Sequence, residues 1–215
     1  MTIDRVLPML SKEKPIFLCN KKYGFLVQKT LEKYDFESEI ILEPFTKNTC
    51  AAIYLAAKYS YKNDYLLIMP TDHLIPQHEE FLLDIEKIQK EMKPHQWITL
   101  GIKPTKPSEA FGYIKVNKNN KNNFYPVEKF IEKPNTEIAQ KLIKEENYFW
   151  NSGIFIARSG FIVKSVKKFA PKIARSSDKA FNEIIINNDR NEATFPEKLF
   201  SEIPSESIDY AVMEK

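Results

Sequence analysis

The sequence YLLIMPTDH, at residues 65–73, decides how the chain is expected to fold. Its five leading residues are apolar, as in a strand that is buried on both faces of a parallel sheet. Pro70 has no backbone N–H and cannot donate a ladder hydrogen bond, so we expect the strand to end there. Thr71, Asp72 and His73 would then emerge at the carboxyl end of the strand, the edge where open α/β sheets bind ligands.

Asp72 has two interpretations at this edge. A carboxylate there can hold a divalent cation against phosphate groups, because hard cations prefer oxygen ligands. The alternative is structural, with Asp72 capping the helix that follows. We expect that helix over residues 78–91, where apolar residues recur on one face.

The segments around this strand alternate in type. Short apolar runs predict strands at residues 15–19, 39–42 and 96–101. Helical spacing and helix-forming residues predict helices at residues 21–34 and from about residue 48, where Asn48 or Thr49 would be the cap. Such alternation is typical of a parallel, doubly wound α/β sheet.

After Gly101 the segments become shorter and richer in turn-forming residues. The expected elements are strands at 112–116, 125–132 and 149–157, a helix at 136–145, and helical structure from residue 159 onward. No internal repeat or linker interrupts the chain. We therefore expect one domain over residues 1–215.

The composition is that of a folded chain with little net charge. Hydrophobic residues make up 43% and aromatic residues 13% of the 215 positions, which is enough to bury a core. The net charge of +3 comes from interspersed acids and bases, which argues against nucleic acid or an anionic membrane as a partner. No apolar run approaches the roughly 20 residues of a membrane helix, and the first residues do not resemble a secretion signal.

The two cysteines, Cys19 and Cys50, lie far apart and lack metal-ligand spacing. They are expected as small apolar residues in the reducing cytoplasm. The histidines show no metal-ligand spacing either. The sequence therefore predicts a cytoplasmic protein.

Three further groups of residues have chemistry to offer. The loop EPFTKNT, at residues 43–49, precedes an expected helix whose free N–H groups, with Lys47, can bind an anion or a nucleobase; the alternative is a plain capped helix. At residues 132–134, EKP supplies a carboxylate for sugar hydroxyls and a lysine for phosphate; the alternative is the end of a surface hairpin. At residues 150–153, WNSG supplies an amide for hydroxyl recognition and a glycine for close approach; the alternative is a β-bulge.

Six segments occur in an order that indicates a family: ILEPFTKNTCAAI, LLIMPTDHLI, TLGIKPTKP with FGYI, VEKFIEKP, FWNSGIFI and SIDYAVMEK. Together they resemble the nucleotidyltransferase domain of mannose-1-phosphate guanylyltransferases, above all the bacterial bifunctional type with a mannose-6-phosphate isomerase domain. The resemblance implies a Rossmann-like, glycosyltransferase-A-like mixed sheet flanked by helices. It also implies that GTP and mannose 1-phosphate react to GDP-mannose and pyrophosphate, with Mg²⁺ and by in-line attack, so that positioning and charge neutralisation are the main tasks.

Carried over residue by residue, the resemblance implies two catalytic positions. Asp72 would bind the metal, and Lys133 would hold the sugar phosphate. The sugar itself would meet the backbone of Gly112 and the side chains of Glu132 and Asn151.

The nucleotide side would be lined by Glu43, Asn48 and Thr49. Asp209 and Tyr210 match the last of the six motifs, but the resemblance assigns them no role. Two alternatives stay open at this point: a nucleotidyltransferase for another sugar 1-phosphate, and a non-catalytic sugar-nucleotide-binding or subunit-like protein.

The chain also departs from the family pattern. It lacks the family's GGxGxRLWPLSR loop, which cradles the triphosphate, and its W-x-DVG-x-W segment, which supplies a second metal ligand. We therefore expect a partial domain, truncated at both ends, with two inner strands left without a partner and no activity alone. A homo-oligomer or a complementing chain that carries the loop is the expected partner. Within the motifs, Glu109-Ala110 replaces Thr-Gly near the sugar, and Lys47 replaces an arginine, which weakens bidentate contacts.

Overall fold

The computed structural model describes residues 2–10, 14–61, 63–119 and 124–215. The helices are α1 Thr2–Leu10, α2 Gly24–Leu31, α3 Asn48–Tyr59, α4 His78–Glu91, α5 Thr136–Leu142, α6 Ser159–Phe169, α7 Pro171–Asn182 and α8 Glu197–Ser201. The strands are β1 Ile16–Asn20, β2 Glu39–Glu43, β3 Tyr65–Ile68, β4 Ile98–Ile102, β5 Tyr113–Val116, β6 Val127–Ile131, β7 Tyr148–Arg158, β8 Ile185–Asn187 and β9 Glu192–Thr194. Short 3₁₀ turns span Lys21–Tyr23 and Asn188–Arg190, and a π-helical turn spans Asp209–Met213.

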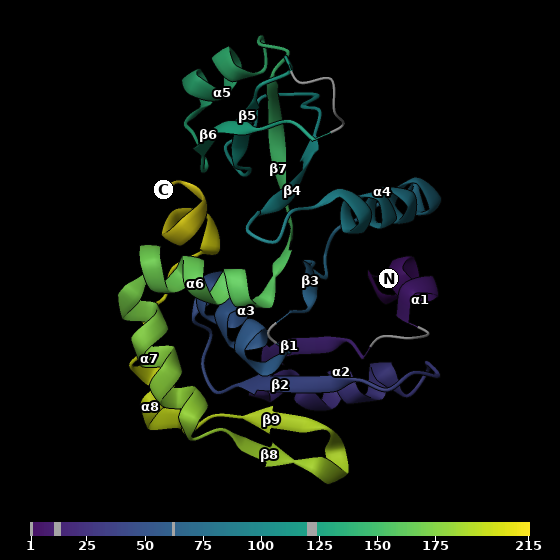
Figure 1. Ribbon diagram of the computed structural model, residues 1–215, viewed down its shortest axis with the longest axis vertical. Coiled ribbons are helices and arrows are strands. Elements are labelled where there is room, and N and C mark those ends of the chain that lie inside the picture. The colour runs from purple at the N-terminus through teal and green to yellow at the C-terminus, as the bar shows by residue number, and fades with distance from the viewer. Residues whose placement is uncertain (1, 11–13, 62, 120–123) are drawn as a thin grey trace.

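The strands form two sheets that lie at the two ends of the long axis (Figure 1). One sheet has the order β1-β2-β9-β8, in which β1, β2 and β9 are parallel and β8 is antiparallel. The other has the order β3-β7-β5-β6, with β4 also paired to β7, and all of its pairs are antiparallel. Within the described residues β1 pairs with β2 alone and β3 with β7 alone, which leaves the sheets separate. The mixed α/β class with flanking helices is confirmed.

The expectation of one parallel sheet through the first hundred residues is wrong. β3 and β4 do not join β1 and β2, because β7 pairs with both of them in antiparallel orientation. An apolar run looks the same in a parallel and in an antiparallel buried strand, so local sequence could not reveal this partner. Only a strand from much later in the chain decides the orientation.

The long strand β7 organises its sheet (Figure 1). β3 pairs with its second half and β5 with its first half, while β4 spans both halves along the opposite edge. Gly153 sits between the halves with a φ of +68°, a left-handed conformation that glycine adopts without steric cost. Residues 150–153 therefore stay within one continuous strand, with a local distortion at Gly153.

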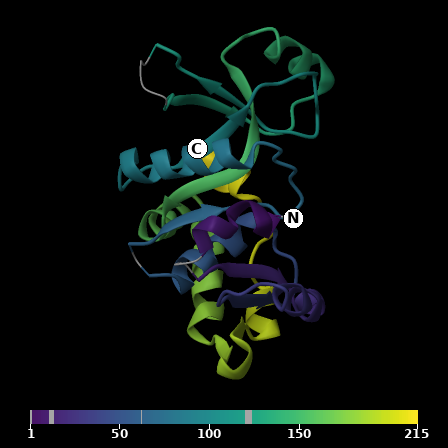
Figure 2. The same ribbon diagram turned by 90° about the vertical axis from the view of Figure 1, so that its right-hand side faces the viewer.

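The largest core surrounds α3, whose Ala-rich sequence is buried nearly all round between the parallel sheet, α6 and α7. Cys50 lies in this core as expected, and the free Cys19 is half-buried. A second core forms where Phe81, Ile85 and Ile88 of α4 pack against β7 and its neighbours, and Figure 2 shows α4 crossing beside that sheet. The predicted helix at residues 78–91 is confirmed.

One segment of the C-terminal part differs from expectation. Residues 185–194, expected as helix, form the hairpin β8–β9, because Asn191 adopts a left-handed φ of 51° and β9 then pairs with β2. The chain finally returns to the middle of the molecule, so that the π-helical turn lies between the two sheets (Figures 1 and 2).

In the parts of the chain that the structure describes, no helix has the length and apolarity to cross a membrane.

Candidate functional site

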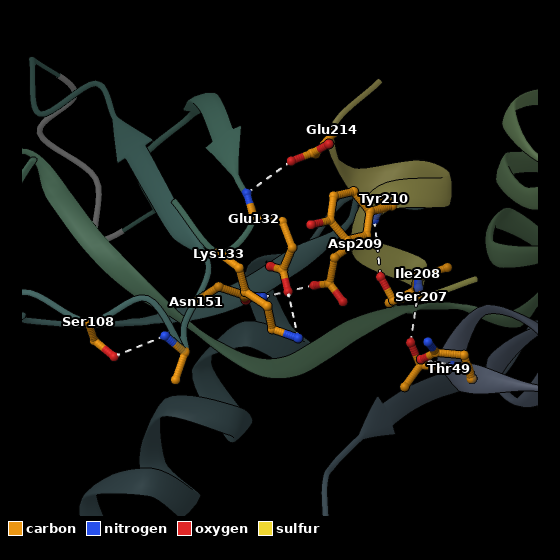
Figure 3. A network of polar contacts seen from close by, with 12 residues as sticks. Thr49, Ser108, Glu132, Lys133, Asn151, Ser207, Ile208, Asp209, Tyr210 and Glu214 are labelled. Atoms are coloured by element: carbon orange, nitrogen blue, oxygen red, sulfur yellow. Dashed lines mark hydrogen bonds and ion pairs between the residues drawn. The ribbon is translucent and has the colours of Figure 1, made fainter. Parts of the chain in front are cut away.

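Four predicted or motif residues converge in the middle of the molecule: Glu132, Lys133, Asn151 and Asp209, here called the carboxylate–amide cluster (Figure 3). Three separate elements supply them, namely the end of β6, the centre of β7 and the π-helical turn. The sequence separates these residues by up to 77 positions (209 minus 132). The tertiary fold therefore brings together motifs that were only ordered in the sequence.

Asn151 is the best-anchored member of the cluster. Its Nδ2 donates to Asp209 Oδ1 at 2.9 Å, and its Oδ1 accepts from the Gly153 N–H at 3.2 Å. The Thr99 hydroxyl lies 2.9 Å from the same Oδ1 and 3.1 Å from the Ile154 carbonyl, so its one proton is shared between them. The side-chain amide is thus held from both ends.

Glu132 brings a largely buried carboxylate to the same place. Its side chain is 9% exposed, and its backbone N–H donates to Glu214 Oε1 at 2.9 Å. Burial raises its pKa above the ordinary value, the negative charge of Asp209 raises it further, and Lys133 lowers it. A Cβ built on Gly112 would overlap with Glu132 Oε2, so only glycine leaves room for this carboxylate. The predicted pair Gly112 and Glu132 are therefore in contact.

Lys133 holds an unusual backbone conformation. Its φ is +45°, a region that costs a non-glycine residue energy and that is concentrated at functional sites. Its Nζ lies 3.7 Å from Glu132 Oε1, and its side chain is 59% exposed. The lysine can therefore neutralise the buried acid and still reach a ligand from solvent.

Asp209 opens the π-helical turn, a rare element that is frequent at functional sites. Burial raises its pKa, while the hydrogen bond from Asn151 and the charge of Lys133 lower it. The preceding residue, Ile208, donates its N–H to Thr49 Oγ1 at 2.9 Å. The segment around Asp209 thus joins the cluster to the start of α3 (Figure 3).

The predicted nucleotide-side residues lie at this start of α3, here called the β2–α3 junction (Glu43, Asn48 and Thr49). Asn48 has a φ of +65°, and its Oδ1 accepts from the Thr49 N–H at 2.8 Å. The N-cap position is Lys47, whose side chain does not cap the helix but donates to the Ser201 carbonyl at 2.5 Å. The expected capping by Asn48 or Thr49 is therefore wrong, and the left-handed Asn48 shapes the junction instead.

Glu43 ends β2 as a buried acid. It is 9% exposed, and its buried Oε1 has no hydrogen-bond partner among the described residues. Burial alone raises its pKa to about 7. Carboxylates with such raised pKa values cluster at functional sites, although structural networks also produce them.

Asp72 makes no hydrogen bond or ion pair with either group among the described residues. It follows β3 at the predicted edge, its side chain is 87% exposed, and its Oδ1 lies 3.9 Å from His73 Nε2. The capping alternative is wrong, because α4 begins after Gln77. Among the residues that the structure describes, no group of three or more histidines, cysteines and acids could hold a metal by itself. Asp72 can therefore offer one oxygen ligand, and not a complete site.

With this geometry in view, comparison with known proteins identifies the family. The model of the family described as "Nucleotidyl transferase" matches residues 2–202. The chain belongs to the nucleotidyl transferase family. The mannose-1-phosphate guanylyltransferase RfbM of Salmonella typhimurium is 35% identical over 99% of the chain. The xanthan biosynthesis protein XanB of Xanthomonas campestris is 34% identical over 94% of the chain.

These similarities have a defined extent. The chain spans about half the length of the curated relatives that it matches, 45% for the Salmonella protein and 43% for XanB. Among solved structures, a mannose-6-phosphate isomerase from Helicobacter pylori superposes on the whole chain with a TM-score of 0.90, at 29% identity and over 82% of its own length. The family assignment and the nucleotidyltransferase fold thus agree with the order of motifs in the sequence.

Sequence reasoning missed several contacts of this nucleotidyl transferase. The sequence predicts only a strand around Thr99, whereas in the structure its hydroxyl holds Asn151 Oδ1. The sequence does not assign Asp209 or Glu214 to a site, because a C-terminal segment gives no local sign of which strand it will contact. Glu109, expected near the sugar, instead accepts from the backbone N–H and the hydroxyl of Thr136 at the start of α5.

Proposed function

We propose that the protein to which this chain belongs transfers a guanylyl group from GTP to mannose 1-phosphate, giving GDP-mannose and pyrophosphate. The proposal is carried by the carboxylate–amide cluster, in which a buried carboxylate, an oriented amide and a lysine face one another. This set matches the chemistry of a sugar phosphate, whose hydroxyls need donors and acceptors and whose phosphate needs a cation. Similarity to mannose-1-phosphate guanylyltransferases supports the choice of substrates.

In this proposal each cluster residue has one task. Glu132 accepts a hydrogen bond from a sugar hydroxyl, Asn151 donates one, and the backbone of Gly112 lies against the sugar. Lys133 pairs with the sugar phosphate, which reduces repulsion between that phosphate and the triphosphate of GTP. The chain forms no covalent bond to substrate, so orientation and charge neutralisation account for its contribution.

The β2–α3 junction is proposed to receive the nucleotide. Its support is the buried, unpartnered Glu43 carboxyl, which a base N–H could satisfy, and the left-handed Asn48 beside the start of α3. Thr49 Oγ1 already accepts from Ile208, so its hydroxyl proton is what it can still offer to a ligand. The free thiols of Cys19 and Cys50 support a cytoplasmic location.

Asp72 is proposed to hold Mg²⁺. The fit rests on its exposed carboxylate after β3, since Mg²⁺ is commonly bound by one or two carboxylates together with substrate phosphates. Such an ion supplies charge neutralisation at the reacting phosphates. For Asp72 itself the task is limited to holding and orienting that ion.

The test combines turnover with binding. GDP-mannose and pyrophosphate formation are measured with GTP or UTP and with mannose or glucose 1-phosphate, and GDP-mannose binding is measured by calorimetry. We expect turnover to be fastest with GTP and mannose 1-phosphate, and Lys133→Ala to lower it. Equal turnover of glucose 1-phosphate with UTP would reject the substrate assignment. Absence of GDP-mannose binding would reject the site.

A further inference from the structure

The side-chain amide of Asn151 has a single orientation. The Gly153 backbone N–H beside Oδ1 can only donate, and Asp209 Oδ1 accepts from Nδ2 at 2.9 Å. Rotating the amide by 180° would face donor with donor and acceptor with acceptor. Amide orientation is normally assigned from the hydrogen-bond network, and here the Gly153 N–H, which can only donate, decides it, in agreement with the bond to Asp209.

This orientation leaves a specific group for a ligand. Among the described residues, one of the two Nδ2 hydrogens is used by Asp209, while Oδ1 already receives the N–H of Gly153 and the Thr99 hydroxyl. Asn151 can therefore act on a ligand as a donor. The Glu132 carboxylate in the same cluster is the complementary acceptor. A hydroxyl both donates and accepts, so one hydroxyl or an adjacent pair satisfies both groups.

We propose that Asp209 is a positioning residue for sugar recognition: it fixes the Asn151 amide so that its free N–H faces a sugar hydroxyl. This inference rests on the proposed function and names the residue that gives the sugar site its polarity. Asp209 can do so because its own backbone is fixed. Its carbonyl accepts from the Glu214 N–H at 3.0 Å, and the neighbouring Ile208 N–H is held by Thr49.

The burial of a second acid next to Glu132 supports this role. Two carboxylates close together repel each other, and removing them from water costs free energy. An alanine at position 209 would pack the turn without that cost. An alanine loses the hydrogen bond to Asn151, and also those that the carboxylate receives from its own backbone N–H and from the Ser207 hydroxyl, whereas an asparagine keeps a side-chain oxygen acceptor.

The binding experiment compares Asp209→Ala with Asp209→Asn. Asparagine keeps a side-chain oxygen that can accept from Asn151 Nδ2, whereas alanine does not. We expect the Kd for mannose 1-phosphate to rise about tenfold or more in the alanine variant and less than about threefold in the asparagine variant. The Kd for GTP should be unchanged in both. Asp64→Asn is the matched control, because Asp64 accepts from the Tyr61 N–H at the far end of β7.

Two results would overturn the inference. One is wild-type affinity for mannose 1-phosphate in Asp209→Ala. The other is an asparagine variant as weak as the alanine variant, which would assign Asp209 a role through its charge. A double-mutant cycle adds a further check, since Asp209→Ala should cause no additional loss once Asn151→Ala is present.

A spectroscopic readout separates this inference from the proposed function. The Asn151 side-chain amide is assigned in a ¹⁵N–¹H spectrum by its loss in Asn151→Ala. We expect its two protons to be well resolved in wild type, and to move together and exchange faster in Asp209→Ala. Unchanged resonances would refute the positioning role even if substrate binds. If no sugar phosphate binds but the resonances respond, the proposed function fails and the positioning of Asn151 stands.

Discussion

The carboxylate–amide cluster and the β2–α3 junction both contain a buried acid, but they differ in the partners that they supply for it. In the cluster, Asp209 accepts from Asn151, and Lys133 lies beside Glu132. At the junction, Glu43 is 9% exposed as a whole residue, and its Oε1 has no hydrogen-bond partner among the described residues. Internal hydrogen bonds organise the carboxylate–amide cluster. The β2–α3 junction instead carries an unsatisfied carboxyl oxygen, and we expect this to make it sensitive to pH and to ligand.

The largest expected effect concerns Glu43 and pH. Its folded pKa of about 7 exceeds the ordinary 4.5, so the folded state holds the proton more tightly than the unfolded state. Stability should therefore be fully retained below about pH 4.5 and should fall as the pH rises to about 7. Between pH 5 and pH 8 we expect this group to lower the free energy of unfolding by roughly 2–3 kcal/mol.

Urea unfolding at both pH values checks this expectation. The Glu43→Gln variant should lose the pH-dependent difference, because glutamine does not titrate. Glu37→Gln, at a side chain that is 86% exposed, is the control and should leave the difference intact. An identical pH dependence in wild type and Glu43→Gln would show that Glu43 is not a buried, unpartnered acid.

The second prediction concerns the close approach of Gly112 to Glu132 in the carboxylate–amide cluster. In Gly112→Ala the new methyl group would overlap with Glu132 Oε2 and force the carboxylate to move. Overpacking of this kind costs about 1–3 kcal/mol, so we expect mannose 1-phosphate affinity to fall by roughly tenfold to a hundredfold. Calorimetry with mannose 1-phosphate and with GTP separates the two regions. A parallel loss of GTP affinity would mean that the overlap disturbs more than the cluster.

The third prediction concerns the left-handed Lys133. Both Lys133→Gly and Lys133→Ala remove the charge, but only glycine accepts a φ of +45° without steric cost. We expect the free energy of unfolding of the glycine variant to exceed that of the alanine variant by about 1 kcal/mol. Both should bind mannose 1-phosphate equally weakly. Equal stability of the two variants would argue against strain at this position.

The smallest expected effect concerns the hydrogen bond between Thr49 and Ile208, which links the β2–α3 junction to the carboxylate–amide cluster. Thr49→Val removes the oxygen that accepts from the Ile208 N–H and should lower the free energy of unfolding by about 1 kcal/mol. Because Ile208 precedes Asp209, we also expect a modest loss of mannose 1-phosphate affinity, smaller than in Asp209→Ala. Thr194→Val is the matched control, since its hydroxyl bonds to the Leu42 carbonyl away from the cluster. A loss as large as that in Asp209→Ala would place the coupling at Thr49.

Local sequence predicted those features that depend on neighbouring residues. The strand before Pro70 and the amphipathic helix at residues 78–91 are both present as expected, although the strand is only partly buried. Each follows from the local pattern of apolar residues. The site roles of Asp72, Lys133 and the other implied residues stay predictions.

Partners that are distant in the sequence could not be found in this way. No local pattern indicates that β7 pairs with β3 and β4, or that residues 185–194 leave the helical pattern to extend the parallel sheet. The same holds for the partners of Asn151, which come from β4 and from the π-helical turn. Such contacts are set by strand pairing and by packing of the C-terminal segment.

The sequence by itself therefore determined the type of most elements before residue 185 and the family, because periodicity and motif order are properties of the chain. The tertiary structure alone decided the polarity of the site. Whether the Asn151 amide donates or accepts depends on what lies beside its two ends; Gly153 is a neighbour in the sequence, but Asp209 is brought to the amide only by the fold. Hydrogen-bond direction is a property of the assembled network, so only the folded chain fixes it.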